Sequence, residues 1–298
     1  MKATIRLVPV KMNILVTGAT GFIGSHLVRR LRDNNHVYCL VRKRGQIEEL
    51  PNQSVIECDL GLPLNSNLLP TDIRAIVHLA QANVPFPEKA NELYRVNTVS
   101  TQELLHYGFK SGITTFIYAS SGSVYGSGNR RFSEDDIPQP LDYYSVTKYC
   151  SELLVSQYRQ HFNTVILRFF APYGVGQKNR LIPNLIERIK KGDEILIYNE
   201  GNPRMNPLYI TDVVEIIARA LTLSDHRVIN VGGQESYNIR EIAELMGKLL
   251  NVAPRYKFLV DKSKQDLVGD VTLMKSLLGY EPKISLAEGL RLMISNNE

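Results

Sequence analysis

The sequence lacks several features that mark membrane, secreted and nucleic-acid-binding proteins. None of its 298 residues belongs to an uninterrupted apolar run of the ~18 residues that a membrane helix needs. Met1 to Lys11 lack an apolar core followed by a small-residue cleavage site, so no signal peptide is expected. The basic residues are scattered, whereas nucleic-acid binding favours a longer basic stripe with interleaved aromatics. We therefore expect neither a membrane nor a nucleic acid as a partner.

Cysteine is also scarce. The three cysteines, Cys39, Cys58 and Cys150, are widely spaced and show no metal-ligand pattern. Buried free thiols in a reducing cytoplasm are the expected state. The sequence thus predicts a cytoplasmic location and no metal site.

What is present is an ordinary globular composition, with 44% hydrophobic and 22% charged residues. The length suits one large domain or two smaller ones. No internal repeat or low-complexity segment occurs. The formal net charge of +5 is compatible with a small anionic ligand.

Apolar strand patterns alternate with amphipathic helix patterns through the first half of the chain. Strands are expected at 13–17, 37–41, 54–57, 75–79, 115–119 and 164–169, and helices at 23–33, 90–110 and 143–161. This alternation predicts an α/β fold with a doubly wound parallel Rossmann sheet. Ligands of such sheets bind at the carboxyl ends of the strands.

After residue 170 the pattern loosens and prolines interrupt it, with helices expected at 182–191, 212–222 and 239–250. We expect an NAD(P)-binding Rossmann domain at 12–170, to which 204–232 returns. Residues 171–203 and 233–298 are expected to form a smaller mixed α/β substrate lobe. Residues 1–11 are interpreted as an N-terminal extension, with Met12 as the alternative start.

The stretch from Gly18 to Gly24 reads GATGFIG and joins the first expected strand to the first helix. The three glycines allow a tight turn, close approach of a pyrophosphate, and packing of helix on strand. The N–H groups and dipole of the helix start then favour phosphate. Predicted cofactor contacts here are Gly18, Thr20, Gly21, Phe22, Ile23 and Gly24. A plain glycine turn is the alternative.

The second strand ends in Leu40-Val41-Arg42-Lys43-Arg44, where an NAD enzyme usually has an acidic residue. An arginine there can hold a 2′-phosphate, which a carboxylate would repel. Arg42 and Lys43 therefore predict NADP(H) over NAD(H), and a solvated basic turn is the alternative. Further cofactor contacts are expected after the third and fourth strands, at Asp59, Leu60, Leu79, Ala80 and Gln81.

Tyr144 and Lys148 fall one helical turn apart at the start of the 143–161 helix. A nearby ammonium lowers a tyrosine pKa by favouring phenolate, and such a tyrosine can exchange a proton with a hydroxyl or ketone. Ser121, in the preceding Ser120–Gly126 loop, could hydrogen-bond the reacting oxygen. A polar Gly/Ser turn is the alternative for that loop.

Together these motifs resemble the extended short-chain dehydrogenase/reductases of the nucleotide-sugar epimerase/dehydratase family. The carriers of the resemblance are the glycine turn, the Ser120–Gly126 loop, Tyr144 with Lys148, the segment 168–174 (RFFAPYG) and the closing 278–282 (LGYEP). The resemblance implies that Tyr144 is the catalytic acid/base, that Lys148 binds the nicotinamide ribose, and that Ser121 is the third catalytic residue. It also places Asn97 among the cofactor contacts, with Ser120 and Ser123 as neighbours of Ser121.

Some positions depart from the family pattern. Family dehydratases carry an acidic residue just after the catalytic Ser/Thr, where this chain has Gly122 and Ser123, so dehydration is not expected. Ala171 stands where many members have asparagine, and the family arginine is missing near Lys264-Gln265-Asp266. Candidate substrate contacts are Ser123, Ala171, and the possible diphosphate ligands Arg180 and Arg204.

The sequence therefore predicts an NAD(P)-dependent epimerase or 4-ketoreductase of a nucleotide-linked sugar. The alternatives are a reductase of a non-nucleotide ketone or aldehyde on the same fold, and a non-catalytic cofactor-binding regulatory protein. By resemblance, the helices at 90–110 and 143–161 are expected to pair in a homodimer. The alternative is that their apolar positions face the chain's own sheet.

Overall fold

The computed structural model describes residues 11–201, 203–261 and 265–296. A seven-stranded sheet organises it, with strand order β12-β7-β5-β4-β1-β2-β3 and parallel pairing throughout. Its strands are β1 Asn13–Thr17, β2 His36–Val41, β3 Gln53–Glu57, β4 Ala75–His78, β5 Thr115–Ser121, β7 Asn163–Phe169 and β12 Arg227–Val231. The predicted doubly wound α/β fold is confirmed. The strand β12 was not predicted as a strand, although it lies in the segment expected to return to the sheet.

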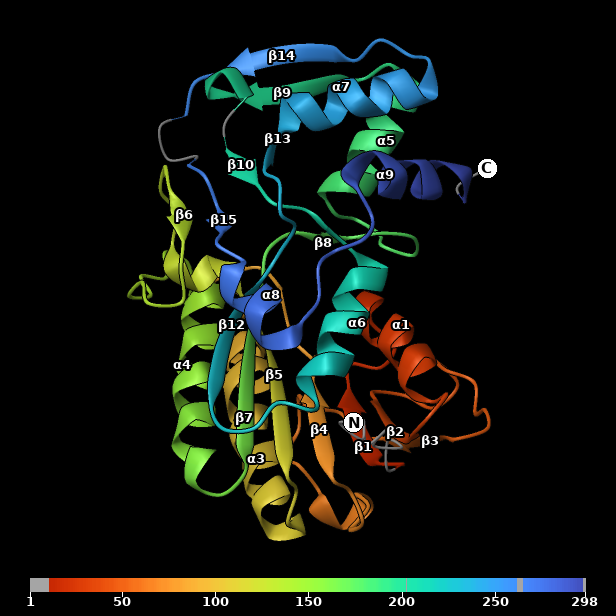
Figure 1. The fold of residues 1–298 in the computed structure, drawn as a ribbon, viewed down its shortest axis with the longest axis vertical. Helices are drawn as coiled ribbons and strands as arrows, with labels where there is room; N and C mark the ends of the chain where they lie inside the picture. The colour runs from red at the N-terminus through yellow and green to blue at the C-terminus, as the bar shows by residue number, and fades with distance from the viewer. Residues whose placement is uncertain (1–10, 202, 262–264, 297–298) are drawn as a thin grey trace, which may run out of the picture.

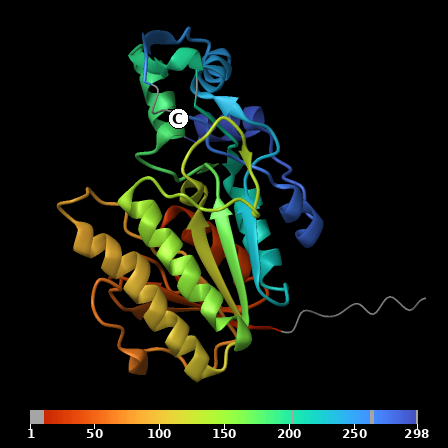
Figure 2. The ribbon, with the colours of Figure 1, turned by 90° about the vertical axis from the view of Figure 1, so that its left-hand side faces the viewer.

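Helices cover both faces of this sheet (Figures 1 and 2). They are α1 Phe22–Leu31 and α6 Ile210–Ala220 on one face, and α3 Ser100–Ser111 and α4 Tyr143–Gln157 on the other. Successive side chains of a strand point to opposite faces, so β1 serves both layers. Ile14 and Val16 pack in one core with Leu27 of α1, whereas Leu15 packs with Leu104 in the other. Such strands read as continuous apolar runs because both faces are buried.

The predicted helix 90–110 is interrupted. It consists of α2 Ala90–Tyr94, a π-helical segment Arg95–Val99 and α3. Two serine hydroxyls donate hydrogen bonds to backbone carbonyls of this segment. Ser100 donates to Val96 O at 2.6 Å, and Ser151 of α4 donates to Asn97 O at 2.7 Å. Single π turns occur mostly at functional sites, and this one lies beside the cleft described below.

The smaller lobe stands beyond the carboxyl ends of the strands, at the top of Figure 1. It contains α5 Leu181–Lys191, α7 Ile239–Leu250, α9 Leu286–Ser295, and the parallel pair β9 Glu194–Tyr198 and β14 Arg255–Leu259. Ile195 and Ile197 of β9 are buried against these helices. These lobe residues belong to the same apolar cluster as Leu27 of α1 and the strands beneath it.

Short strands connect the two parts. They are β6 Arg131–Phe132 with β15 Val268–Gly269, β8 Pro172–Tyr173 with β11 Leu208–Tyr209, and β10 Arg204–Met205 with β13 Tyr237–Asn238. The helix α8 Thr272–Leu278 contacts β12 and α6. Residues 268–278, predicted as substrate lobe, therefore lie against the sheet domain. The remaining short helical segments are Ser66–Leu68, Gly122–Tyr125, Tyr158–Gln160 and Asn199–Gly201.

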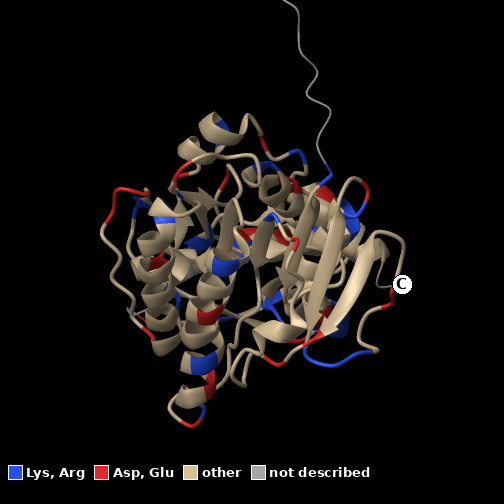
Figure 3. Cartoon of the chain, turned by 90° about the horizontal axis from the view of Figure 1, so that it is seen from below, with Lys and Arg blue, Asp and Glu red and all other residues tan. Residues whose placement is uncertain are grey.

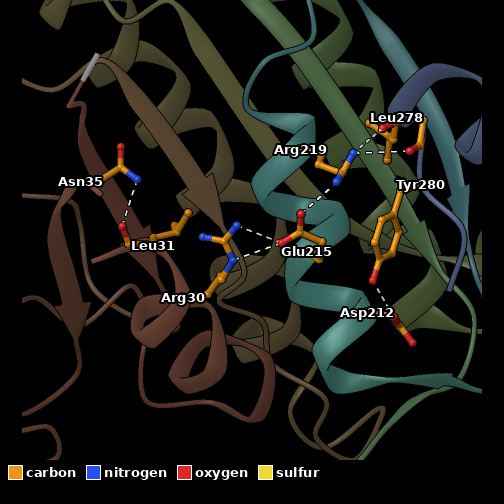
Figure 4. Close-up of polar contacts among 9 residues, drawn as sticks. Arg30, Leu31, Asn35, Asp212, Glu215, Arg219, Leu278 and Tyr280 are labelled. Carbon is orange, nitrogen blue, oxygen red and sulfur yellow. Dashed lines mark hydrogen bonds and ion pairs between the residues drawn. The ribbon is translucent and has the colours of Figure 1, made fainter. Parts of the chain in front are cut away.

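Polar contacts of α6 connect α1 to the segment after α8 (Figure 4). Arg30 donates two hydrogen bonds to Glu215, and Arg219 reaches the Leu278 carbonyl at 3.2 Å. The buried carboxylate of Asp212 accepts from the Tyr280 hydroxyl at 2.6 Å. The closing LGYEP motif is thereby fixed to the sheet domain.

No helix among the described residues is long and apolar enough to cross a membrane. In Figure 3, basic and acidic residues are interspersed along the ribbon, as the scattered sequence pattern predicts.

Candidate active site

The glycine turn between β1 and α1 forms one wall of a large cleft. Gly18 has a φ of +68°, and a Cβ on it would stand 2.8 Å from the Ala80 nitrogen. A Cβ on Gly24 would stand 2.0 Å from the Gly18 oxygen, so only glycine allows α1 to approach this closely. The N-cap residue Gly21 supplies no side-chain cap. The first N–H groups of α1 are therefore available to an anion, which fits the diphosphate of a dinucleotide.

The cleft has a volume of about 1040 Å³ and extends from the glycine turn to the start of α5. Most of the predicted site residues line it: Gly18, Thr20, Gly21, Phe22, Ile23, Gly24, Arg42, Asp59, Leu60, Leu79, Ala80, Gln81, Ser121, Ser123, Tyr144, Ala171 and Arg180. Pockets for one drug-sized ligand measure roughly 300–1000 Å³. The cleft is thus large enough for two ligands side by side.

Four predicted site residues lie outside this lining. Lys43 is exposed beside it, and Lys148 is buried behind it. Arg204 is directed elsewhere: its guanidinium binds the Ser236 carbonyl at 2.5 Å and pairs with Glu241 at 3.0 Å. Arg204 does not line the cleft, and its predicted contact with a diphosphate stays a prediction.

Asn97 is the fourth predicted site residue that lies outside the cleft lining. Its amide accepts from Ala82 N at 2.7 Å, and its two N–H groups donate to Ala82 O and to the Thr147 hydroxyl. It is 1% exposed and does not line the cleft, and the expected contact with a cofactor stays a prediction. Asn97 joins the loop after β4 to α4, and thereby positions Tyr144.

Tyr144 lies at the cleft wall, with its hydroxyl donating to Gln81 Oε1 at 2.8 Å. Burial raises the pKa of Tyr144 to about 12; Asp142 raises it further, whereas Arg180 and the Gln81 hydrogen bond oppose this. The sequence predicted a lowered pKa for Tyr144, whereas burial raises it. Tyr144 is therefore a neutral phenol at physiological pH.

Lys148 is 1% exposed, and its ammonium donates to the Ala119 carbonyl at 2.5 Å. It also lies 4.3 Å from the centroid of the Tyr118 ring. Burial lowers the pKa of Lys148 to about 7, although the carboxylate of Glu152 opposes this. The ammonium is thus held at the end of β5, close behind the cleft wall.

A chain of hydroxyl groups starts at Ser121. Its Oγ lies 2.8 Å from Ser123 Oγ, and Ser145 Oγ lies 2.8 Å from Ser123 Oγ and 3.0 Å from Asp142 Oδ2. Asp142 is also the N-cap of α4, accepting from Ser145 N at 2.8 Å. The roles of Ser145 and Asp142 were not predicted from the sequence. The sequence signal that could have identified them is an aspartate three residues before a serine at a helix start, which is typical of an N-cap.

The position after Ser121 is closed to a carboxylate by packing. A Cβ on Gly122 would stand 2.5 Å from the Phe170 ring, and one on Gly269 would stand 2.6 Å from the same ring. Phe170 thus fills the space between these two glycines. An acidic side chain at 122 would have to displace this ring, which gives a steric reason for the missing acid.

Ala171 lines the cleft with a φ of +45°, a left-handed conformation that costs a non-glycine residue energy and that asparagine tolerates better. Strain of this kind is frequent at functional sites. On the same cleft, Arg180 precedes α5, which has no side-chain N-cap. An exposed cation beside a helix start is suited to an anionic ligand.

At the other end of the cleft, Arg42 follows β2 and pairs loosely with Asp59 at 3.9 Å. Their side chains are 64% and 41% exposed, so this ion pair is weak. The Arg42 guanidinium is therefore free to rearrange onto a phosphate.

A buried histidine beneath the cleft was not predicted. His78 Nδ1 lies 2.7 Å from Thr17 Oγ1, and Nε2 lies 3.0 Å from Thr101 Oγ1. Thr101 donates to a backbone carbonyl, so it accepts from Nε2–H, and Thr17 donates to Nδ1. Burial, with Lys148 nearby, lowers the pKa of His78 to about 3, so the ring is neutral. Thr17 in turn accepts from Ala80 N, which fixes the cofactor loop.

A second buried network supports the floor of the site. Glu152 of α4 pairs with Arg168 of β7 at 2.6 Å, and Ser120 donates to Glu152 at 2.5 Å. Arg168 also donates to the Tyr125 hydroxyl at 2.7 Å. These contacts hold α4 and the Ser120–Gly126 loop in a fixed relation. A buried charge pair of this kind is costly to break on one side.

Comparison with known proteins assigns the family. The sequence model of the NAD dependent epimerase/dehydratase family matches residues 14–232. This chain belongs to that family. The predicted family membership, and with it the prediction of an enzyme of the extended short-chain dehydrogenase/reductase type, is therefore confirmed.

Relatives in this family resemble the chain over nearly its whole length. An uncharacterized protein of Methanocaldococcus jannaschii is 35% identical, covering 94% of each chain. UDP-glucuronic acid decarboxylase 5 of Arabidopsis thaliana is 29% identical, covering 95% of this chain and 88% of that one. Both a decarboxylase and proteins described as epimerases are thus among the relatives.

Solved structures agree with the fold. The UDP-glucuronic acid 4-epimerase of Bacillus cereus, in complex with UDP-glucuronic acid and NAD, has a TM-score of 0.87 at 30% identity, covering 95% of this chain and 98% of that one. MoeE5 in complex with UDP-glucose and NAD has a TM-score of 0.84 at 30% identity, covering 95% and 97%. Both neighbours hold NAD, so the predicted preference for NADP(H) has no support from them.

Proposed function

We propose that this chain is an NAD(P)-dependent nucleotide-sugar epimerase or 4-ketoreductase. The observation that carries the proposal is one cleft lined by the glycine turn, Ser121 and Tyr144, with volume for a dinucleotide and a second ligand. The two solved neighbours described above contain a UDP-sugar and NAD. A UDP-sugar is therefore the first substrate class to test.

The nicotinamide group, when bound, supplies the hydride acceptor or donor. Tyr144 is proposed to give or take the proton of the reacting oxygen, and Ser121 to hydrogen-bond the same oxygen. Lys148 is proposed to position Tyr144 and Ser121 from behind the cleft wall, because its ammonium donates to the Ala119 carbonyl near the end of β5. Arg180 at the start of α5 is proposed to bind the diphosphate of the sugar nucleotide.

The protonation of Tyr144 favours one direction of the reaction. With a pKa raised to about 12 and its hydroxyl donating to Gln81, Tyr144 is prepared to act as an acid. Ketone reduction needs an acid, whereas the first step of an epimerase needs a base. An epimerase must therefore first deprotonate Tyr144, which a bound nicotinamide cation favours. Cofactor retained after purification would indicate the epimerase.

Arg42 supports a preference for NADP(H), since its guanidinium lies on the cleft and no carboxylate occupies its position. We expect Arg42→Ala to raise KM for NADPH at least about 10-fold and to leave KM for NADH within about 2-fold, because one charge-assisted phosphate contact contributes roughly 1.5–3 kcal/mol. Lys257→Ala, at an exposed position of β14 outside the cleft lining, is the control. A wild type that clearly prefers NADH would overturn the assignment.

The substrate class is tested by thermal unfolding with UDP-, dTDP- and GDP-sugars. A ligand present at about 100 times its Kd stabilises the fold by roughly 2.7 kcal/mol. We expect UDP-sugars to raise Tm, and Arg180→Ala to reduce that rise. Turnover of simple ketones or aldehydes without any response to nucleotide sugars would favour the second candidate, a non-nucleotide reductase. Ala171, which stands where many family members have asparagine, is compatible with that candidate. The non-catalytic alternative predicts cofactor binding without turnover.

Two further predictions stay untested. The cytoplasmic location rests on the free cysteines, of which Cys39 is buried and carries a pKa raised to about 12 by that burial. The homodimer through α3 and α4 rests on resemblance alone, although Phe109, Val146 and Leu153 are exposed on these helices.

A further inference from the structure

We propose that Ser123, Ser145 and Asp142 form a proton relay that connects Ser121 to solvent. This proposal rests on the proposed function, because only a reaction that changes the protonation of Tyr144 requires a proton path. The Oγ atoms of Ser121, Ser123 and Ser145 follow one another at 2.8 Å, and Asp142 Oδ2 ends the chain 3.0 Å from Ser145. All links are within normal O–H···O distance.

The geometry leaves each hydroxyl proton a choice of two directions. Ser145 carries a single hydroxyl proton, yet both Ser123 Oγ and Asp142 Oδ2 lie within reach. Ser121 Oγ accepts from the Ser123 backbone N–H at 3.1 Å, so its own proton is free to point to Ser123 or into the cleft. A chain that can reverse its direction can pass protons either way.

The two ends of the chain differ in solvent contact. Ser145 is fully buried, whereas Asp142 is exposed at the mouth of the cleft. Ser121 lies on the wall of the cleft that also carries Tyr144. When two ligands fill the cleft and exclude water, the serine chain still joins its interior to the exposed carboxylate.

The reaction needs such a path. Tyr144 rests as a phenol, so it must lose one proton before it can accept the proton of a sugar hydroxyl, and it must regain one after it has protonated a reduced ketone. After ketone reduction, Tyr144 is a phenolate. Ser121 then gives its proton to the oxygen of the new hydroxyl group, and that hydroxyl group gives its own proton to Tyr144. Ser123 then restores Ser121, Ser145 restores Ser123, and Asp142, protonated by water, restores Ser145. One proton moves from water to the phenol, no electrons move along the chain, and oxidation runs the same steps in reverse.

A purely structural role for these residues makes a different prediction, because Ser121 and Asp142 are also helix N-caps. Asp142→Asn separates the two roles, since asparagine caps a helix as well as aspartate but does not accept the relayed proton. Ser123→Ala breaks the chain in the middle, and Ser123→Thr restores the hydroxyl at a position that faces the cleft. Ser156→Ala, on the same helix α4 but bonded to Glu152 O, is the matched control.

The test loads the wild type and the variants with NAD⁺ and, in a parallel series, with NADP⁺, and mixes them with UDP-glucose, UDP-glucuronic acid, UDP-N-acetylglucosamine or dTDP-glucose. Three quantities are measured: the first-turnover rate of absorbance change at 340 nm in H₂O and D₂O, proton release with an indicator dye, and the Kd of the sugar nucleotide by calorimetry. We expect Ser123→Ala and Asp142→Asn to slow the first turnover and proton release about 10- to 100-fold. Their Kd values should stay within about 2-fold, and Ser123→Thr and Ser156→Ala should resemble the wild type.

The wild-type rate should also fall in D₂O. Its dependence on the deuterium fraction of the solvent should be non-linear, because more than one proton moves in the same step. An active wild type whose rate, isotope effect and proton release are unchanged by Ser123→Ala and Asp142→Asn would overturn the relay alone. A wild type inert towards all four sugar nucleotides would overturn the proposed function and the relay with it.

Discussion

At the scale of single residues, the site depends on polar groups held in defined protonation states. Tyr144 is a phenol because burial raises its pKa to about 12, and His78 is a neutral imidazole because it is buried beside Lys148. The sequence predicted Tyr144 from its spacing to Lys148, but it did not predict either of these states. Both depend on desolvation and on partners distant in sequence.

The buried histidine makes stability depend on pH. Its pKa is about 3 when folded and about 6.5 when unfolded, so between these values only the unfolded chain takes up the proton. Acidification through this window therefore destabilises the folded state. We expect the wild type to lose about 2 kcal/mol more unfolding free energy than His78→Gln between pH 7.5 and pH 5, measured by urea denaturation. Parallel losses in both proteins would contradict the neutral buried ring.

The residues that line the cleft were largely predictable, because a glycine turn and strand ends carry local signals. Those missed were Ser145, Asp142, Phe170 and His78. Asp142 acts as a local N-cap, whereas the other three act through contacts with segments farther along the chain, such as Phe170 against Gly122 and Gly269. Such pairings are set by the packing of elements, which no local pattern records. For the same reason, Asn97 and Arg204 were expected at the cleft but use their polar groups elsewhere.

At the scale of elements, the junction of β1 and α1 leaves no room for a side chain at Gly24. We expect Gly24→Ala to cost about 3 kcal/mol of unfolding free energy, at the upper end for overpacking because the obstacle is backbone. It should also weaken NAD binding, since α1 must shift away from β1. Urea denaturation and calorimetry measure the two effects. Gly128→Ala is the control, because its Cβ would meet Phe132 only at an ordinary 3.5 Å.

The contacts of α6 in Figure 4 differ in strength according to burial. Tyr280→Phe removes a hydrogen bond to the buried Asp212, which should cost about 1.5–3 kcal/mol. Arg30→Ala removes an ion pair whose arginine is 41% exposed, which should cost at most about 1 kcal/mol. Chemical denaturation of both variants tests this order. Equal losses, or a larger one for Arg30→Ala, would contradict it.

At the scale of the whole molecule, the alternation of strand and helix patterns predicted the sheet domain, because each buried strand is a continuous apolar run. The division of the second half was harder to predict. Residues 268–278 return to the sheet through the β15–β6 pair and the contacts of α8 with β12. These are short elements whose position depends on contacts with Phe132, Phe170 and Asn206, and not on their own periodicity.

Catalysis by Tyr144 in a cleft between the two parts is the central claim. The most direct measurement is kcat for a UDP-sugar in the wild type and in two single-atom variants on the same helix, Tyr144→Phe and Tyr143→Phe. Tyr143 stacks on Phe86 at 4.5 Å and does not line the cleft. We predict that Tyr144→Phe lowers kcat by about 10²–10⁴-fold with an unchanged sugar-nucleotide Kd, and that Tyr143→Phe stays within about 2-fold. Full turnover by Tyr144→Phe would contradict the account.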